Sequence, residues 1–317
     1  MKDTQELEFT GERFVPDVGG NIELEHLHRY YLAAQISSGR LVLDCACGEG
    51  YGSDILANVA DRVVGLDISL DTVKHARSRY VKSNLEYMVG SCAEIPLPDA
   101  SIDLVVSFET IEHHDQHEQM MREIKRVLRE SGILLISSPD KYFYSVENDY
   151  TNPHHVKELY GYEFKRLIGK FFKNSCYYGQ RVSFGSGIFS EYFATPIRNH
   201  LYAKKRVRSG AGFIDPLYWI ALASDTELPT LASGIFEQAI NETEIVLSWK
   251  GVVAARDEEL CRVKQTVCDR GVQISHLSEE LRNHDVALAD ICRTRELVEA
   301  MRRSRSWRIT SPLRFVA

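Results

Sequence analysis

Short apolar runs and longer amphipathic segments alternate along the first half of the chain. The apolar runs predict five strands, which fall within residues 41–44, 62–67, 84–90, 98–107 and 132–139. Apolar residues such as Met121 and Ile124 recur at helical spacing in a segment predicted as a helix over residues 118–130. Strands that alternate with helices favour a doubly wound, mostly parallel sheet in an α/β fold. From about residue 176 to 235 the pattern is weaker and suits two last strands, with residues 213–223 as the closing strand.

The C-terminal quarter repeats every seven residues. With Leu260 at position a, the a residues are Leu260, Val267, Ile274, Leu281 and Leu288, and the d residues are Val263, Arg270, Leu277, His284, Ile291 and Val298. This period predicts a helical coiled-coil stalk over residues 236–300, which joins copies of the chain through residues 260–298. A long amphipathic helix that packs on its own domain would show the same pattern. The number of copies does not follow from the sequence.

The loop after the first strand carries a distinctive set of small and acidic residues. Asp44 ends the apolar run, and Ala46, Gly48 and Gly50 follow at alternate positions. Small residues let the backbone approach a ligand, and glycine adopts the positive φ that a tight turn needs. Asp67 ends the second strand, where a carboxylate can accept hydrogen bonds from both ribose hydroxyls. The spacing therefore predicts a site for a nucleoside.

Residues 44–50 resemble the glycine-rich motif of class I S-adenosylmethionine-dependent methyltransferases, which reads D/E-x-G-x-G-x-G. The resemblance extends over about residues 10–170 and implies a Rossmann-like fold with S-adenosyl-L-methionine as cofactor. Ala46 departs from the motif, and we expect it to keep the loop if its φ is negative. The cofactor-binding residues that the resemblance implies are Asp44, Ala46, Gly48, Gly50, Asp67, Ile68, Ser91, Cys92, Ala93 and Phe108. Ser91 stands where the family commonly has an acid. A G-x-G-x-x-G dinucleotide fingerprint is absent, which disfavours a dehydrogenase or an epimerase.

The N-terminal arm, residues 1–40, contains a second resemblance. The segments at residues 10–16 and 25–30 are similar to the leader (T-G-E-R-x-x-P, then E-H-x-H-R-Y) of bacterial methyltransferases found with polysaccharide biosynthesis enzymes. Such leaders fold over the cofactor as a lid. Arg29 and Tyr30 are therefore candidates for binding the methionine carboxylate, and Arg13 could do the same. A solvated charge on a helix face is the alternative for Arg29.

The candidates for the general base that activates the methyl acceptor are histidines. Residues 152–159 resemble a family motif (N-P-x-H-x-x-E-L) and are predicted to open a helix below the active-site mouth. His155 is the first candidate for the general base, with Glu158 as its partner, and His113 is the second. A purely structural role, in which His155 caps a helix and Glu158 orients it, is nearly as well supported. No metal is expected, because histidine is a poor magnesium ligand and no suitably spaced pair of carboxylates accompanies it.

Composition excludes several classes of protein. The chain has 317 residues, of which 44% are hydrophobic, and a net charge of −7, which argues against a nucleic-acid partner. Its seven cysteines include no C-x-x-C pair. The first residues are polar and no apolar run has the roughly 18–20 residues of a membrane span, so we expect a cytoplasmic protein. The basic tail, residues 301–317, resembles tails found beside coiled coils in bacterial glycosyltransferases. It suggests a glycosyltransferase partner or, at most, peripheral contact with the inner membrane.

Together these patterns predict four segments: the arm at 1–40, a methyltransferase domain at 41–235, the stalk at 236–300 and the tail at 301–317. By the resemblance of leader and tail, the enzyme would O-methylate a sugar of a cell-surface polysaccharide, such as the O-antigen of lipopolysaccharide, or its nucleotide-sugar precursor. Two alternatives stay open. One is a small-molecule methyltransferase of the quinone or polyketide type, and the other is a non-catalytic coiled-coil scaffold with a vestigial methyltransferase domain.

Overall fold

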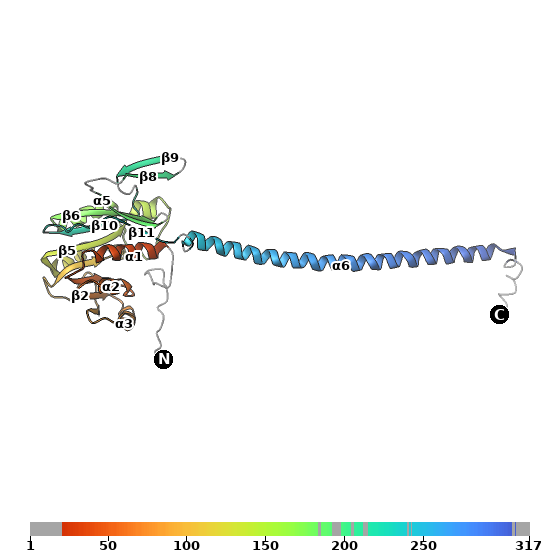
Figure 1. Cartoon of the computed structure of the whole chain (residues 1–317), viewed down its shortest axis with the longest axis horizontal. Helices are drawn as coiled ribbons and strands as arrows, with labels where there is room; N and C mark the ends of the chain where they lie inside the picture. Colours follow the sequence, from red (N-terminus) through yellow and green to blue (C-terminus); the bar gives the residue numbers. More distant parts are fainter. Residues whose placement is uncertain are drawn as a thin grey trace. The chain divides into compact units, whose positions relative to one another are not determined.

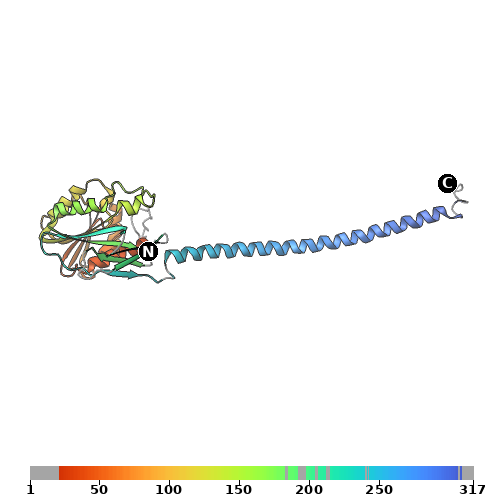
Figure 2. The same cartoon turned by 90° about the horizontal axis from the view of Figure 1, so that it is seen from above.

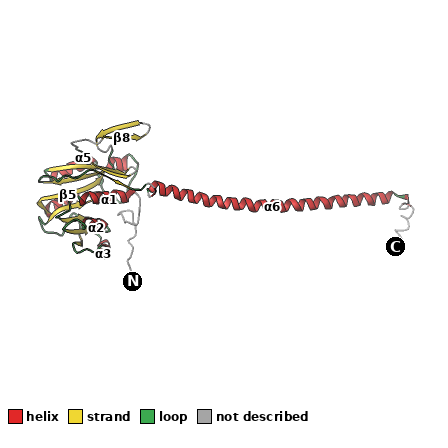
Figure 3. Cartoon of the chain, viewed as in Figure 1, coloured by secondary structure: helices red, strands yellow, loops and turns green. Residues whose placement is uncertain are grey.

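The computed structural model of the chain describes residues 21–182, 185–191, 198–203, 206–211, 215–239, 241, 243–305 and 308. It divides into two compact units, residues 1–246 and residues 247–317. All the strands among the described residues lie in the first unit, and one long helix, α6 (Glu244–Arg303), makes up most of the second (Figure 3).

A nine-stranded sheet forms the centre of the first unit (Figures 1 and 2). Its strands are β1 (Leu41–Cys45), β2 (Arg62–Asp67), β3 (Leu85–Val89), β4 (Ile102–Ser107), β5 (Leu128–Pro139), β6 (Asn174–Val182), β7 (Gly185–Ser190), β10 (Tyr218–Ser224) and β11 (Gly234–Glu237). The order across the sheet is β3-β2-β1-β4-β5-β10-β6-β7-β11. The first five strands in this order pair in parallel, and β10 is antiparallel to both its neighbours. β8 (Arg198–Ala203) and β9 (Arg206–Ala211) form a separate antiparallel pair.

Helices cover both faces of this sheet. They are α1 (Asn21–Ala34), α2 (Tyr51–Leu56), α3 (Leu70–Arg79), α4 (His117–Val127) and α5 (Gly161–Phe171). Successive strand residues pack into different cores: Val42 belongs to the cluster that contains residues of α1 and α2. Leu43 belongs to the cluster that contains residues of α4 and α5. The apolar runs are therefore continuous because each strand is buried on both faces, as expected for a parallel sheet.

Three local expectations were wrong. The helix predicted over residues 118–130 ends at Val127, because Leu128 already pairs with Ile102 and begins β5. The helix expected to open at residue 152 begins only at Gly161, after a loop. The region from 176 to 235 holds more strands than the two expected, although the closing strand is confirmed as β10. Two short helical turns complete the unit, η1 (Ile111–His113) and η2 (Tyr142–Val146).

The 60-residue helix α6 has no buried residue, and every apolar residue of the predicted seam is exposed. The coiled coil of α6 with a second helix stays a prediction. Among the described residues, no helix is both long and apolar enough to cross a membrane. The N-terminal residues 10–16 and most of the tail lie outside the described residues.

Candidate functional site

The turn between β1 and α2 is built from residues with positive φ. Ala46, Gly48 and Gly50 have φ values of 64°, 55° and 101°. The negative φ on which the expectation for Ala46 depended is not found, and the turn forms with a left-handed alanine, which costs about 1–2 kcal/mol relative to an ordinary conformation. A Cβ on Gly50 would lie 2.8 Å from both Ala76 Cβ and the Tyr87 hydroxyl. Glycine is thus required at position 50 by both conformation and space.

Asp44, which comes just before this turn, holds neighbouring segments together by hydrogen bonds. It is fully buried and accepts hydrogen bonds from the Tyr30 hydroxyl (3.1 Å) and the Ser53 hydroxyl (2.6 Å). Burial raises the pKa of Asp44 to about 7, and the two hydroxyl donors oppose that rise. The bond to Tyr30 joins α1 to the end of β1.

Asp67 connects the two loops at the carboxyl ends of β1 and β2. Its Oδ2 accepts a hydrogen bond from the Gly48 N–H at 3.0 Å, and its Oδ1 accepts one from the Ser69 N–H at 2.9 Å. Each carboxylate oxygen has a second lone pair available for a ligand hydroxyl. Asp67 is therefore oriented by the backbone and can still accept hydrogen bonds from a ribose.

Two adjoining cavities open at this edge of the sheet. The first, which we call the cofactor pocket, has a volume of about 370 Å³ and is lined by Ala46, Gly48, Asp67, Ile68, Gly90, Ser91, Cys92, Ala93, Glu109, Thr110, His113, His114 and Gln116. The second, the acceptor pocket, has about 250 Å³ and is lined by Ile22, Glu25, His26, Tyr30, Ala46, Cys47, Gly48, Tyr51, Phe108, Glu109, Glu112, His113, Tyr144, Tyr150, Asn152, His155 and Tyr218. Ala46, Gly48, Glu109 and His113 line both cavities, so the two are neighbours.

Most of the predicted cofactor residues line the cofactor pocket, including Ser91, which also accepts a hydrogen bond from the Ala93 N–H. Tyr30 and Phe108 line the acceptor pocket instead. Asp44, Gly50 and Arg29 line neither cavity.

Arg29 lies behind the acceptor pocket in a cluster of buried charges. Its side chain is fully buried, and Nη1 contacts Gln180 Oε1 at 3.1 Å and Glu109 Oε1 at 3.3 Å. Its Nε and Nη2 have no hydrogen-bond partner among the described residues. Arg29 is therefore not a solvated charge, and its role as a carboxylate partner stays a prediction.

Glu109 and Glu25 give the acceptor pocket an acidic wall. Glu109 stands just after β4 with φ of 49°, and its Oε1 accepts a hydrogen bond from the Ser137 hydroxyl at 2.5 Å. Glu25 accepts one from the Tyr218 hydroxyl at 2.9 Å, and burial raises its pKa to about 7. Sequence reasoning missed Glu25 and Tyr218, because only the folded sheet brings the closing strand against α1.

The three predicted catalytic residues lie close together, and two of them, His113 and His155, line the acceptor pocket. His155 Nδ1 donates to Glu158 Oε1 at 2.5 Å, and His113 Nδ1 lies 3.0 Å from the His154 carbonyl oxygen. The two imidazole rings contact edge to face, with centroids 5.2 Å apart. Glu112 joins them, with ligand atoms of Glu112, His113 and His155 all within 4.8 Å of one another. Burial, helped by the charge of Glu109, raises the pKa of Glu112 well above its usual range. Glu158 lines neither pocket and reaches the site only through His155.

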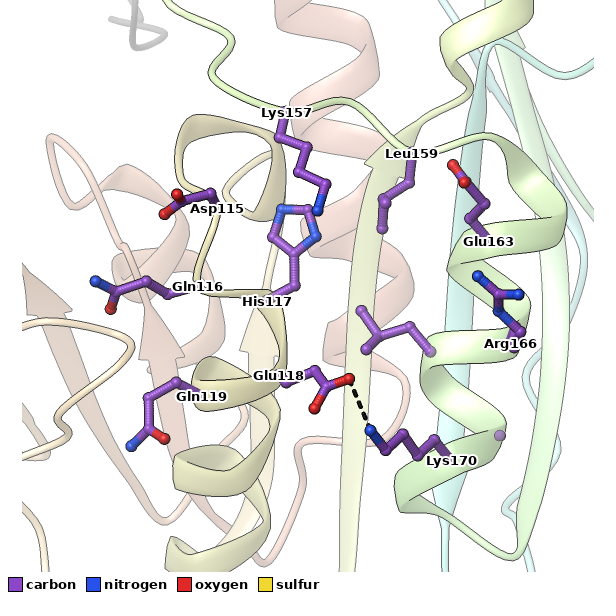
Figure 4. Close-up of a pocket in the computed structure, with 12 residues that line it drawn as sticks. Asp115, Gln116, His117, Glu118, Gln119, Lys157, Leu159, Glu163, Arg166 and Lys170 are labelled. Carbon is purple, nitrogen blue, oxygen red and sulfur yellow. Dashed lines mark hydrogen bonds and ion pairs between the residues drawn. The ribbon is translucent and has the colours of Figure 1, made fainter.

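A wider depression of about 900 Å³, which shares Gln116 with the cofactor pocket, lies between the start of α4 and α5. Figure 4 shows the side chains that line it, with the Glu118–Lys170 ion pair (2.7 Å) across the opening. It contains both signs of charge and none of the predicted cofactor or catalytic residues.

Parts of the chain are similar to known methyltransferases. Residues 43–136 match the family described as a methyltransferase domain. A "probable S-adenosylmethionine-dependent methyltransferase" of Mycolicibacterium smegmatis is 42% identical over 51% of this chain and 63% of its own length. The malonyl-[acyl-carrier protein] O-methyltransferase of Yersinia pestis is 32% identical over 38% of this chain and 45% of its own. A methyltransferase structure from Thermotoga maritima covers 64% of this chain and 90% of its own with a TM-score of 0.48 and 15% identity.

The chain therefore spans less than two thirds of the length of these curated relatives. The family match at residues 43–136 spans the turn after β1, Asp67, β2 to β4 and parts of β1 and β5. These similarities support a class I S-adenosylmethionine-dependent methyltransferase domain, with S-adenosyl-L-methionine as its cofactor.

Proposed function

We propose that this chain is an S-adenosylmethionine-dependent methyltransferase that methylates a hydroxyl oxygen of a sugar, in a cell-surface polysaccharide or its nucleotide-sugar precursor. The observation that carries the sugar assignment is the polar lining of the acceptor pocket. Carboxylates, an amide and tyrosine hydroxyls surround it, among them Glu25, Glu109 and Asn152. Carboxylates and amides hydrogen-bond hydroxyl groups, and tyrosine rings offer faces for a sugar ring. The resemblance of the N-terminal leader to methyltransferases of polysaccharide biosynthesis supports the same class.

The cofactor pocket fits S-adenosyl-L-methionine by its residues. Asp67 would hold the ribose, the loop at Ser91–Ala93 would flank the adenine, and the turn at Ala46 and Gly48 would lie against the amino-acid part. When bound, the cofactor supplies an electrophilic methyl group. The protein's own part is to hold the acceptor next to it, and positioning alone can supply a large share of the rate.

An acceptor hydroxyl also needs help to lose its proton, since its own pKa is far above 7. His155 with Glu158, or His113, provides that help in this proposal. The hydrogen bond from His155 Nδ1 to Glu158 orients the ring and leaves Nε2 as the basic nitrogen. Asn152 Nδ2 lies 3.1 Å from His155 Nε2 and is placed to donate to that lone pair, so an acceptor hydroxyl has to displace the amide before His155 takes its proton.

An acyl or other small-molecule acceptor is the second candidate. Relatives include proteins named malonyl-[acyl-carrier protein] O-methyltransferase and fatty-acid O-methyltransferase. An apolar acceptor fits an apolar cavity better, whereas polar side chains, most of them tyrosines, histidines and carboxylates, make up most of the lining of this one. A non-catalytic scaffold with a vestigial methyltransferase domain is the third candidate function. It predicts that the cofactor pocket does not bind S-adenosyl-L-methionine.

We also propose that α6 forms a coiled coil with a second copy of the chain. The heptad register found in the sequence continues back to Val246, Trp249 and Val253, close to the start of the helix. A 60-residue helix with no buried residue gains no stabilisation from packing unless a partner covers its apolar stripe. A glycosyltransferase partner, a cytoplasmic location and contact of the tail with the inner membrane are further parts of this proposal.

Matched substitutions in the full chain test the coiled coil. Ile274→Asp with Leu281→Asp places charges at two a positions and should give a monomer by light scattering. Val272→Asp with Val286→Asp adds the same charges at exposed f positions of the same helix and should leave the assembly intact. Equal behaviour of the two pairs would contradict the assigned seam.

The enzymatic proposal is tested by binding and then by turnover. Calorimetry with S-adenosyl-L-methionine should show micromolar binding, and NAD should not bind; failure to bind either would favour the scaffold. Methyl-labelled cofactor is then offered with nucleotide sugars and polysaccharide fragments in one set and with fatty acids and malonyl thioesters in another. Labelled sugar supports the proposal, whereas label only in the acyl set would replace it. His155→Ala should lower turnover with cofactor affinity nearly unchanged, and His154→Ala, whose side chain lines neither pocket, is its control.

A further inference from the structure

Three side chains that can ligate a metal ion lie together in the acceptor pocket. Glu112 and His113 lie on η1, and His155 comes from the loop that precedes α5. The loop is tied to η1 through the backbone, since the Val156 and Lys157 N–H groups both donate to the Glu112 carbonyl oxygen, at 2.9 and 3.0 Å. These bonds bring His155 beside the other two, so that one ligand atom from each lies within 4.8 Å of the others.

Both histidines are held in the way that metal-binding histidines are held. His113 Nδ1 faces the His154 carbonyl oxygen at 3.0 Å, and His155 Nδ1 faces the Glu158 carboxylate at 2.5 Å. A carbonyl and an ionised carboxylate only accept hydrogen bonds, so each Nδ1 carries the proton and each Nε2 carries the lone pair. A ring N–H bound to a carbonyl or a carboxylate is the usual outer contact of a metal-ligating histidine. Ser145, whose hydroxyl donates to Glu158 Oε1 at 2.8 Å, orients that carboxylate in turn.

Glu112 supplies the third group and an independent observation. Its side chain is 1% exposed, and its Oε2 has no hydrogen-bond partner among the described residues. An unpartnered buried polar atom costs about 1–3 kcal/mol, and more when it is charged. A cation between Glu112 and the two imidazoles would satisfy it.

We propose that Glu112, His113 and His155 bind one divalent transition-metal ion of the zinc, iron or cobalt class. Imidazole nitrogens suit these ions, whereas magnesium and calcium prefer sites made of oxygen ligands. Three protein ligands leave positions open for an exogenous ligand, as in catalytic rather than structural metal sites. The proposal rests on the methyl-transfer function in one respect: a hydroxyl bound at an open position would be held in the acceptor pocket and made more acidic. The ion would then take over the Nε2 lone pair that Asn152 contacts, and His155 would act as a ligand instead of a base.

The experiment measures metal binding by the full chain, independently of turnover. The purified protein is stripped with a chelator and titrated with Zn²⁺ by calorimetry and with Co²⁺ by visible absorption. One ion per chain is expected, with the Co²⁺ bands of a nitrogen and oxygen site. His113→Ala and His155→Ala should each weaken metal binding by more than about 100-fold. Glu158→Gln, which only weakens the hydrogen bond that orients His155, should weaken it by about 10–100-fold. His154→Ala keeps the backbone carbonyl that holds His113 and should bind as the unaltered chain does.

Several results would overturn the proposal. These are no binding of Zn²⁺ or Co²⁺ at millimolar concentration, tighter binding of Mg²⁺ than of Zn²⁺, or affinity that survives replacement of both histidines. Sulfur-to-cobalt charge-transfer bands would move the site to cysteines. An unchanged far-ultraviolet circular dichroism spectrum and an unchanged unfolding midpoint in each variant show that the fold is intact. Cofactor binding without metal binding would refute this site alone, whereas metal binding without cofactor binding would refute the methyltransferase proposal alone.

Discussion

Gly52 lies under the ring of Tyr30, and replacing it with alanine should damage both the core and the wall of the acceptor pocket. A Cβ at position 52 would lie 1.9 Å from Tyr30 Cζ and 2.2 and 2.3 Å from the two Cε atoms. The ring would have to move by about 1.5 Å to reach ordinary contact at 3.4 Å. It is confined by Tyr51 and Phe108, with ring centroids 5.3 and 5.2 Å away, and by the hydrogen bond from its hydroxyl to Asp44.

Three contributions set the magnitude. Overpacking a well-filled core costs about 1–3 kcal/mol. Loss of a hydrogen bond to a charged group costs about 1.5–3 kcal/mol, although Ser53 still donates to Asp44. Alanine regains about 0.5–1 kcal/mol over glycine inside a helix. We therefore expect Gly52→Ala to lower the free energy of unfolding by about 1.5–5.5 kcal/mol.

Urea unfolding followed by tryptophan fluorescence measures this change. Gly169→Ala is the matched control, because Gly169 also lies in a helix but a Cβ there meets nothing within 4 Å. It should stabilise the protein by about 0.5–1 kcal/mol, opposite in sign. In a Tyr30→Ala background the cost of Gly52→Ala should largely disappear. A Gly52→Ala protein as stable as the Gly169→Ala protein, or a cost unchanged without the Tyr30 ring, would refute the reasoning.

Three other perturbations follow from the site. Asp67→Ala should abolish cofactor binding measurable by calorimetry, because it removes the group that accepts hydrogen bonds from the ribose and from the Gly48 N–H. Asp71→Ala, on the exposed surface of α3, is the control. Unchanged affinity of Asp67→Ala would contradict the assignment of Asp67 to the ribose. Asp44 has a pKa of about 7 in the folded chain against 3.8 for an ordinary aspartate, so its stabilising contribution is complete below pH 4 and is lost as pH rises through 7. Between pH 5 and pH 8 the free energy of unfolding should therefore decrease less in Asp44→Asn than in the unaltered chain, by on the order of 2–4 kcal/mol. Urea unfolding at a series of pH values measures this, and an equal decrease in both proteins would show that Asp44 does not titrate in this range. A chain that ends at residue 246, in the first turn of α6, should bind cofactor with unchanged affinity and be monomeric by light scattering. A persistent oligomer would place the interface in the first unit.

The cofactor pocket could be predicted well because its parts are local in sequence. Parallel strands place their carboxyl ends at one edge, so the segments after β1, β2 and β4 had to lie side by side once the strands were identified. Asp67 and Gly48 are joined there by a hydrogen bond, as their places in the two loops suggested. The conformation of Ala46 could not be predicted, because the loop imposes a positive φ on a residue that does not favour one.

The acceptor pocket is different, since distant segments contribute one or two side chains each. Nothing in the spacing of Glu25 or Tyr218 links them, yet 193 positions apart they share a hydrogen bond of 2.9 Å. The sequence singled out His113 and His155 separately, but only the backbone bonds between η1 and the loop bring both beside Glu112.

By itself, the sequence determined the α/β order of elements, the nucleoside-binding turn and the heptad period of the C-terminal helix, because each depends on neighbouring residues and on regular spacing. The tertiary structure alone decided which charges became buried and which side chains share one cavity. Burial and contact between remote residues depend on how the sheet and its helices pack. The polar acceptor pocket and the Glu112–His113–His155 cluster therefore emerge only in the folded chain.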